Sequence, residues 1–455
     1  MTKKKVLWGV FILLFLVLIS GSIYLNSLLP IITGYAAKNL CSDVFVSGRD
    51  ARDVEAIDLN FSFIKDTKNK VDQSEKRVTS RYLWGRSTAI YREGFGATLV
   101  RDIPEKVLRK EVYPVDTHPG YRQDTTAWPL GDVVTDTVAT GIDRQALDEI
   151  SKKLINDNAY QGYPFAFLVI HKGIPVTEAY KPQFNRNTRF LSWSVAKSFT
   201  NAIVGVLVRE GKVDIMKPAG IKEWKGDERS KITLNDLMQM QSGLKWNEDY
   251  GSRSDVNIML FCKGDMSKYA ISRPLGFLSG THWYYSSGSD NIVSYLIREQ
   301  FENDTSCYAF VQDKFFEKIG ITDAVFEVDP SGDFVGSSYL YATARDYGRF
   351  GLLYLNDGVF NGERVLPEGW VKYTTTPAKD SKGKYGSCFW LNKSGTYPSA
   401  PNDMYSCEGH DGQMIFILPS QQMVIVILGF SHGPENNMNL DRLLKDILGT
   451  LTINK

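Results

Sequence analysis

The stretch Ser194-Val195-Ala196-Lys197 decides the fold class of this chain. It follows a short apolar segment, residues 190–193, and opens a longer one, residues 195–208, which we expect to be a helix. Residues at i and i+3 share one face of a helix, so the amine of Lys197 can reach the hydroxyl of Ser194. First-turn amides would also stabilise developing negative charge. If burial or a neighbouring cation lowers the pKa of the lysine, the serine becomes an activated nucleophile.

Ser-x-x-Lys is a weak signal by itself, because the chain contains further matches. Ser242 precedes Lys245 in a loop after a predicted helix, and Ser381 precedes Lys384 in a lysine- and glycine-rich surface run. We expect both serines to be solvated. For Ser194 the alternative is helix capping, which would be preferred if the motif stood alone. Two further motifs favour the nucleophile.

The second motif is Tyr285-Ser286-Ser287, which lies in a run of aromatic and small residues. Tyr285 could exchange a proton with a leaving group, and a nearby ammonium would lower its pKa. Ser287 would hold the lysine or the substrate by a hydrogen bond. The alternative is ordinary turn packing, and Tyr284 competes with Tyr285 on sequence alone.

The third motif, His410-Asp411-Gly412, comes directly before a predicted strand. Gly412 would let a substrate approach the strand edge closely. The amide of Gln413, together with that of Ser194, would form an oxyanion hole. His410 could contact a substrate carboxylate when protonated or orient its neighbours when neutral. The alternative for this motif is a simple turn at the start of a strand.

Apolar spacing predicts a sheet built from both ends of one domain. Helices are predicted at 142–155 and 437–448, and strands at 165–170, 174–180, 414–418 and 423–430. A helical, loop-rich middle, roughly 215–370, separates the two groups of strands. We therefore expect an α+β domain, with an antiparallel sheet flanked by helices and an inserted helical subdomain. The active site would lie at their junction.

The N-terminus predicts membrane insertion. Lys3-Lys4-Lys5 precedes an uncharged run, residues 6–29, which as a helix would be roughly 36 Å long. The lysines favour a cytoplasmic N-terminus and an extracytoplasmic catalytic domain. The alternative is a cleaved signal peptide, with 20–22 as the small residues near the cut. We expect a tail and single transmembrane anchor at 1–37, an N-terminal extension at 38–135 and the catalytic domain at 136–455.

Composition and charge exclude several other classes. The net charge of +1 gives no basic footprint for nucleic acid. Neither a zinc-protease motif nor a phosphate-binding or dinucleotide loop is present, so we predict no metal and no organic cofactor. Among the five cysteines, Cys388 could pair with Cys407, or Cys262 with Cys307, if export oxidises them, although packing is the simpler role. The oligomeric state stays open.

The order of the three motifs resembles that of the penicillin-recognising serine hydrolases. These include class C β-lactamases, D-alanyl-D-alanine carboxypeptidases, family VIII-type esterases and 6-aminohexanoate-dimer hydrolases. The run Gly409-His410-Asp411-Gly412-Gln413 is most similar to the 6-aminohexanoate-dimer hydrolase branch. The resemblance covers roughly 140–450 and implies the β-lactamase/transpeptidase-like fold. It also implies Ser194 as nucleophile, Lys197 as its base and Tyr285 as the acid/base partner.

Two departures from the family pattern bear on the substrate. Ser287 stands where β-lactamases usually have asparagine, and His410 stands where they usually have lysine. Both weaken recognition of the β-lactam carboxylate, which favours hydrolysis of another small-molecule or short-peptide amide or ester. The alternative is a non-catalytic binder or sensor of cell-wall peptides or β-lactams. We expect Trp246, Glu248 and Tyr250 to be ordinary loop residues near the entrance.

Overall fold

The computed structural model describes residues 3–111, 113, 122–135 and 140–452. At its centre is an antiparallel sheet of six strands in the order β12-β13-β14-β15-β5-β6. The predicted sheet is confirmed, because β15 pairs with both β14 and β5 and so joins the two ends of the domain. The strands are β5 (Pro164–His171), β6 (Ile174–Tyr180), β12 (Trp390–Leu391), β13 (Tyr405–Gly409), β14 (Gln413–Leu418) and β15 (Met423–Gly429).

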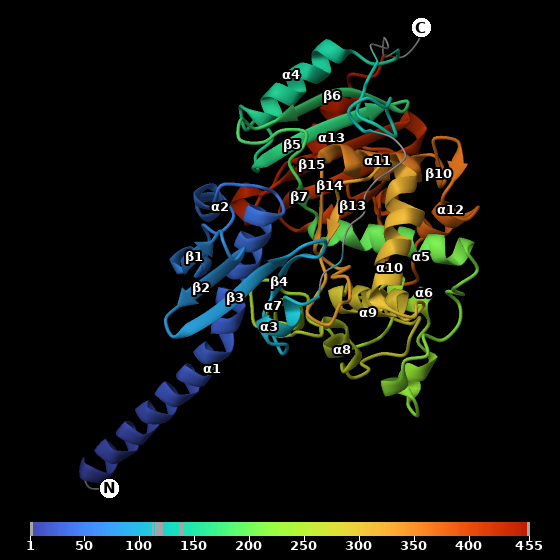
Figure 1. The fold of residues 1–455 in the computed structure, drawn as a ribbon. Helices are drawn as coiled ribbons and strands as arrows, with labels where there is room; N and C mark the ends of the chain where they lie inside the picture. Colours follow the sequence, from blue (N-terminus) through green and yellow to red (C-terminus); the bar gives the residue numbers. More distant parts are fainter. Residues whose placement is uncertain (1–2, 112, 114–121, 136–139, 453–455) are drawn as a thin grey trace.

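Helices cover both faces of this sheet (Figure 1). The helices α4 (Arg144–Ile155) and α13 (Leu440–Leu448) pack on one face, and α11 (Ala344–Leu355) packs on the other. Every residue of β5 and β15 is therefore buried, which explains why these strands are apolar at nearly every position. Gly351 brings α11 close to the sheet, since a Cβ at this position would lie 2.4 Å from a methyl carbon of Val424.

The middle of the chain forms the predicted helical region beside the sheet (Figure 1). Its helix α5 is buried at every position from 196 to 207. The helices are α5 (Ala196–Arg209), α6 (Leu234–Met238), α7 (Asp255–Cys262), α8 (Met266–Ile271), α9 (Ser287–Arg298), α10 (Asp304–Val311) and α12 (Trp370–Thr374). The short strands are β7 (Phe190–Leu191), β8 (Val325–Phe326), β9 (Leu340–Ala342), β10 (Val359–Phe360) and β11 (Glu363–Arg364).

The N-terminal helix α1 (Lys3–Phe45) joins the candidate membrane span to the body without a break (Figure 1). The boundary expected at residue 37 falls inside this helix, and that expected at 136 lies outside the described residues. The second half of helix α1 packs against a four-stranded antiparallel sheet. The remaining elements are α2 (Ala51–Ile57), β1 (Lys68–Asp72), β2 (Arg77–Tyr82), β3 (Gly85–Arg92), β4 (Gly96–Leu99) and α3 (Glu105–Leu108).

Buried polar contacts bind the second half of α1 to the body. The ammonium of Lys38 forms an ion pair with Glu327, and both side chains are almost fully buried. The Glu327 carboxylate also accepts hydrogen bonds from Ser42 Oγ (2.9 Å) and from the amide of Ala97 (2.7 Å). Residues that sequence reasoning assigned to an extension thus form part of the core.

The five cysteines all carry free thiols, so neither of the two pairings considered is formed. Four of them are buried, including Cys388 and Cys407. Packing is therefore their role in this fold.

Candidate active site

The first motif lies in a tight turn between β7 and α5. Trp193, the residue before Ser194, has φ +43°, in a region that non-glycine residues adopt only with strain. Its indole is 2 % exposed and is held by aromatic neighbours, stacking on Tyr35 of α1 (ring centroids 6.2 Å apart) and meeting His410 edge to face (5.4 Å). This strained turn presents the half-exposed Ser194 at the start of α5.

The ammonium group of Lys197 contacts side chains of both the first and the second motif. Its Nζ lies 2.9 Å from Ser194 Oγ, 3.1 Å from Ser287 Oγ and 2.8 Å from the carbonyl oxygen of Ser337. The side chain is 1 % exposed, and this burial lowers the pKa of Lys197 below 10.5, against the opposing charges of Glu248 and Asp290. A lysine in such a place can be neutral and accept the proton of Ser194.

Tyr285 is the tyrosine that faces this group, whereas Tyr284 is 46 % exposed. The Lys197 ammonium lies 4.9 Å from the centre of the Tyr285 ring, and the ring stacks on Trp390 (5.4 Å). Burial, reinforced by the charge of Glu248, raises the pKa of Tyr285 well above 10.0, although a hydrogen bond with Ser194 opposes the shift. The expected lowering of this pKa was wrong, because desolvation dominates. Tyr285 is a neutral phenol that can donate a proton.

Glu248 is the residue that sequence reasoning missed. Its carboxylate accepts hydrogen bonds from the hydroxyl (2.5 Å) and the amide (2.9 Å) of Ser287, and from the indole of Trp246 (2.5 Å). It therefore orients Ser287, which in turn contacts Lys197. The loop position of Glu248 gave no signal of this, because its partner lies 39 positions further along the chain.

The third motif also lies beside the nucleophile turn. A Cβ at Gly409 would lie 2.3 Å from the carbonyl oxygen of Ser192, so only glycine allows this approach. His410 stacks on Tyr250 (4.6 Å, rings 15° apart), and burial lowers its pKa. A neutral imidazole favours the orienting role over the binding of a carboxylate.

The other two residues predicted around this motif have structural tasks. Gly412 has φ +91°, which glycine adopts without strain. The side chain of Gln413 is buried and bridges to β15, donating to the carbonyl of Gly429 (2.5 Å) and accepting from its amide (3.1 Å). The approach of substrate to Gly412 and the oxyanion hole formed by the Gln413 and Ser194 amides stay predictions.

Three possible metal ligands meet at the end of the third motif. His410 Nε2 and His432 Nδ1 lie 3.3 and 2.8 Å from Asp411 Oδ1, and the ligand atoms of the three residues fall within 4.8 Å of one another. Two imidazoles and a carboxylate could hold a zinc-like cation. The same geometry is that of a hydrogen-bonded network, and the contact with Asp411 raises the pKa of His432. The expected absence of metal and cofactor stays a prediction.

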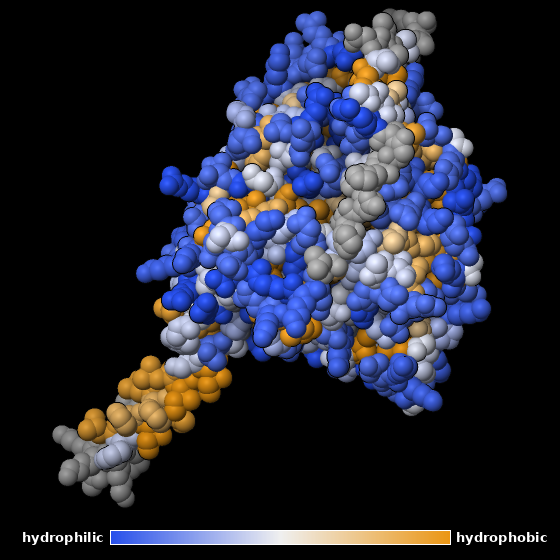
Figure 2. Space-filling view, viewed as in Figure 1, coloured by the Kyte–Doolittle hydropathy of each residue, from blue (hydrophilic) through white to orange (hydrophobic). Residues whose placement is uncertain are grey.

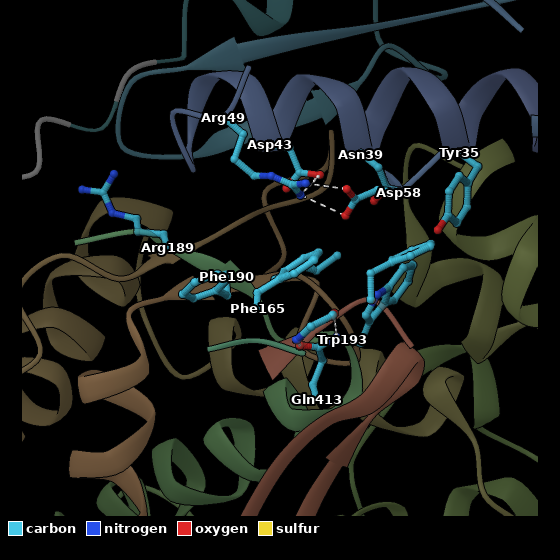
Figure 3. A pocket seen from close by; sticks show the side chains of 13 residues that line it. Tyr35, Asn39, Asp43, Arg49, Asp58, Phe165, Arg189, Phe190, Trp193 and Gln413 are labelled. Atoms are coloured by element: carbon cyan, nitrogen blue, oxygen red, sulfur yellow. Dashed lines mark hydrogen bonds and ion pairs between the residues drawn. The ribbon is translucent and has the colours of Figure 1, made fainter. Parts of the chain in front are cut away.

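A cavity of about 30 Å³ lies behind Trp193. Figure 3 shows Tyr35 and Asn39 of α1 on one side and Trp193 and Gln413 on the other, with Arg49 bonded to Asp58 above. Its volume suits one or two water molecules and not a substrate. It lies between α1 and the domain, so α1 contributes to the support of the nucleophile turn.

The chain is similar to known proteins in sequence and in fold. The family model named Beta-lactamase matches residues 154–448, more than half of the chain. A 6-aminohexanoate-dimer hydrolase from Paenarthrobacter ureafaciens is 26% identical over 223 residues, which is 46% of this chain and 56% of that relative. The match thus spans little more than half the length of the relative.

Solved structures share the fold. A Bacillus anthracis protein provisionally named a 6-aminohexanoate-dimer hydrolase is 24% identical and has a TM-score of 0.55, covering 70% of this chain and 85% of that one. A class C beta-lactamase is 14% identical with a TM-score of 0.52, covering 69% and 97%. A penicillin-binding protein homologue from Caulobacter crescentus is 16% identical with a TM-score of 0.51, covering 70% and 100%. The chain belongs to the beta-lactamase family and has its β-lactamase/transpeptidase-like fold.

Proposed function

We propose that this protein is a serine hydrolase that cleaves an amide or ester bond through an acyl-enzyme on Ser194. The observation that carries the proposal is the contact of 2.9 Å between Ser194 Oγ and the buried Lys197 Nζ, because burial favours the neutral amine that a general base requires. A small-molecule or short-peptide substrate fits the departures from the β-lactamase pattern at Ser287 and His410.

Acylation begins with proton transfer from Ser194 to Lys197. The Ser194 oxygen attacks the substrate carbonyl, and the carbon–oxygen double bond opens to an oxyanion, which backbone amides would stabilise. Collapse breaks the bond to the leaving amine or alcohol. Tyr285 donates its proton to the leaving group, and the ammonium of Lys197 returns a proton to Tyr285.

Deacylation reverses these roles. A water molecule gives a proton to the Lys197–Tyr285 pair and attacks the acyl carbon. Ser194 Oγ leaves and recovers that proton, so the enzyme returns to its starting state and the acid is released.

We also propose that α1 anchors the protein in a membrane, with the catalytic domain on the extracytoplasmic side. The exposed part of α1 supports this, since its most apolar window is wholly exposed and its mean hydropathy is 2.3. Lys3-Lys4-Lys5 supports a cytoplasmic N-terminus.

The test is exposure of the full chain in mild detergent to a fluorophosphonate, followed by mass spectrometry of the intact protein and its peptides. We expect one adduct, on Ser194, which Ser194→Ala removes. Ser381→Ala is the matched control, because Ser381 also precedes a lysine by three positions but donates to the carbonyl of Tyr385. A folded protein without an adduct would favour the non-catalytic binder.

A further inference from the structure

The turn between β2 and β3 exposes a group of large apolar side chains. Leu83 and Trp84 at its tip are both 61% exposed, and Phe63, whose ring lies 6.2 Å from that of Tyr82, is 55% exposed. Single exposed apolar residues are ordinary on soluble proteins, but a clustered group marks an interaction site. We call the residues Phe63, Tyr82, Leu83 and Trp84 the hairpin patch.

The hairpin patch lies where α1 leaves the body (Figure 1). Trp84 Nε1 donates a hydrogen bond to Asn26 Oδ1 (3.1 Å), and Gly85 lies so close to Leu29 that a Cβ would come within 2.7 Å of its side chain. Figure 2 shows the exposed part of α1 as a hydrophobic rod that enters the body at this side. The patch is therefore continuous with the candidate membrane span.

The length of the candidate membrane span determines the depth at which the hairpin patch would lie in the bilayer. From Leu7 to Asn26 a helix extends roughly 30 Å, about the thickness of the hydrocarbon core. Asn26 would then lie at the far boundary of that core. Trp84, bonded to it, would lie at the level of the headgroups, where tryptophan and tyrosine are enriched.

Charge on the same hairpin suits phosphate groups. Arg81 and Arg86 are cross-strand partners, and both are exposed. Within the described part of the chain, neither guanidinium has an ion-pair partner. Two free guanidinium groups beside exposed aromatic and aliphatic side chains match the interface of a bilayer, where lipid phosphate groups lie next to the acyl chains.

We propose that the hairpin patch docks into the interface of the bilayer that α1 spans, with Arg81 and Arg86 on lipid phosphates. This inference rests on the proposed anchor. Because α1 continues unbroken into the domain, the two contacts would fix the orientation of the active site. Tyr35, which packs on Trp193, lies nine residues beyond Asn26, about 14 Å further along the helix.

The test places an environment-sensitive dye on the full chain in liposomes that contain anionic phospholipid. The dye is attached at Leu83→Cys, with Met216→Cys as the matched control, since Met216 is 65% exposed and lies in the loop after α5. Of the five native cysteines, four are buried and one is half-buried. Treating the unsubstituted chain with the same dye therefore measures the background labelling of these cysteines. Flotation with the vesicles, dye emission and quenching by lipid-attached and by aqueous quenchers are measured.

We expect the dye at position 83 to emit at shorter wavelength than that at 216, to be quenched by the lipid-attached quencher and to be shielded from the aqueous one. Arg81→Gln with Arg86→Gln should weaken this shielding. If the chain floats with the vesicles but the dyes at 83 and 216 behave alike, the docking is wrong while the anchor stands. If the chain does not float, the anchor and the docking are both wrong, whereas serine labelling would still test the hydrolase.

Discussion

Replacement of Lys38 by methionine should destabilise the whole catalytic domain. The change leaves the Glu327 carboxylate, which is fully buried, without its cation, and only Ser42 and the amide of Ala97 still donate to it. Removing one partner of a buried ion pair costs about 3–5 kcal/mol. The ratio of folded to unfolded protein would fall by a factor of more than about 100.

The assay is urea unfolding of the full chain in mild detergent, followed by tryptophan fluorescence. Lys231→Met is the matched control, because Lys231 and Glu228 form an exposed pair with side chains 69% and 54% exposed. Its effect should stay within about 0.5 kcal/mol. Adding Glu327→Gln to Lys38→Met should recover much of the loss, since the amide is neutral and can still accept hydrogen bonds.

The sign of the pH dependence adds a second check. Burial raises the pKa of Glu327, so a neutral Glu327 is favoured in the folded state as the pH falls. The deficit of Lys38→Met should therefore shrink at low pH and grow as the pH rises. An unchanged unfolding midpoint would show that the second half of α1 does not belong to the cooperative unit of the domain.

Four further predictions concern the site. Lys197→Met should slow fluorophosphonate labelling of Ser194 by about 10²–10⁴-fold, as expected for the loss of a general base. An unchanged labelling rate would show that Lys197 is not the base. In the unsubstituted chain the labelling rate should rise with pH and level off below pH 10.5, because burial lowers the pKa of Lys197; a rise that begins only at that pH would contradict the buried amine. Glu248→Gln should move this rise to lower pH, since the Glu248 carboxylate raises the pKa of Lys197; a shift to higher pH would refute the assigned sign. Gly409→Ala should suppress labelling and destabilise the fold by about 1–3 kcal/mol, because the new methyl group would lie 2.3 Å from the Ser192 carbonyl oxygen. If the variant unfolds and is labelled like the unsubstituted chain, the turn tolerates the methyl group and this reasoning is wrong.

Local patterns sufficed to predict the central elements. The runs that became β5 and β15 are apolar at nearly every position, and the helix after Ser194 is mostly apolar from Ala202 to Val208. Both are recognisable without knowledge of their neighbours. Local context favoured Ser194 over Ser242 and Ser381, which stays a prediction. The expectation that those two serines are solvated was wrong, because they are only 4% and 2% exposed.

Long-range partners account for what could not be predicted. Lys38 is the first charge after the apolar run, so the membrane anchor was expected to end at residue 37. The helix continues past it because Lys38 pairs with Glu327, 289 positions away. The strand β13 is too short for the alternation of Tyr405 and Cys407 with Ser406 and Glu408 to mark it, and its pairing with β12 and β14 defines it. The pKa of Tyr285 depends on burial that only the assembled fold supplies.

The most direct test of the central claim is a time course of the acyl-enzyme by intact-protein mass spectrometry. The full chain is mixed with members of a panel of activated esters, amides and β-lactams, and the mass of the protein is followed until the substrate is consumed. The proposed mechanism predicts, for at least one of them, a mass increase equal to the acyl group that maps to Ser194, decays with release of the acid, and is absent in Ser194→Ala. An adduct that forms on Ser194 and never decays, for every member of the panel, would contradict hydrolysis and identify a covalent binder.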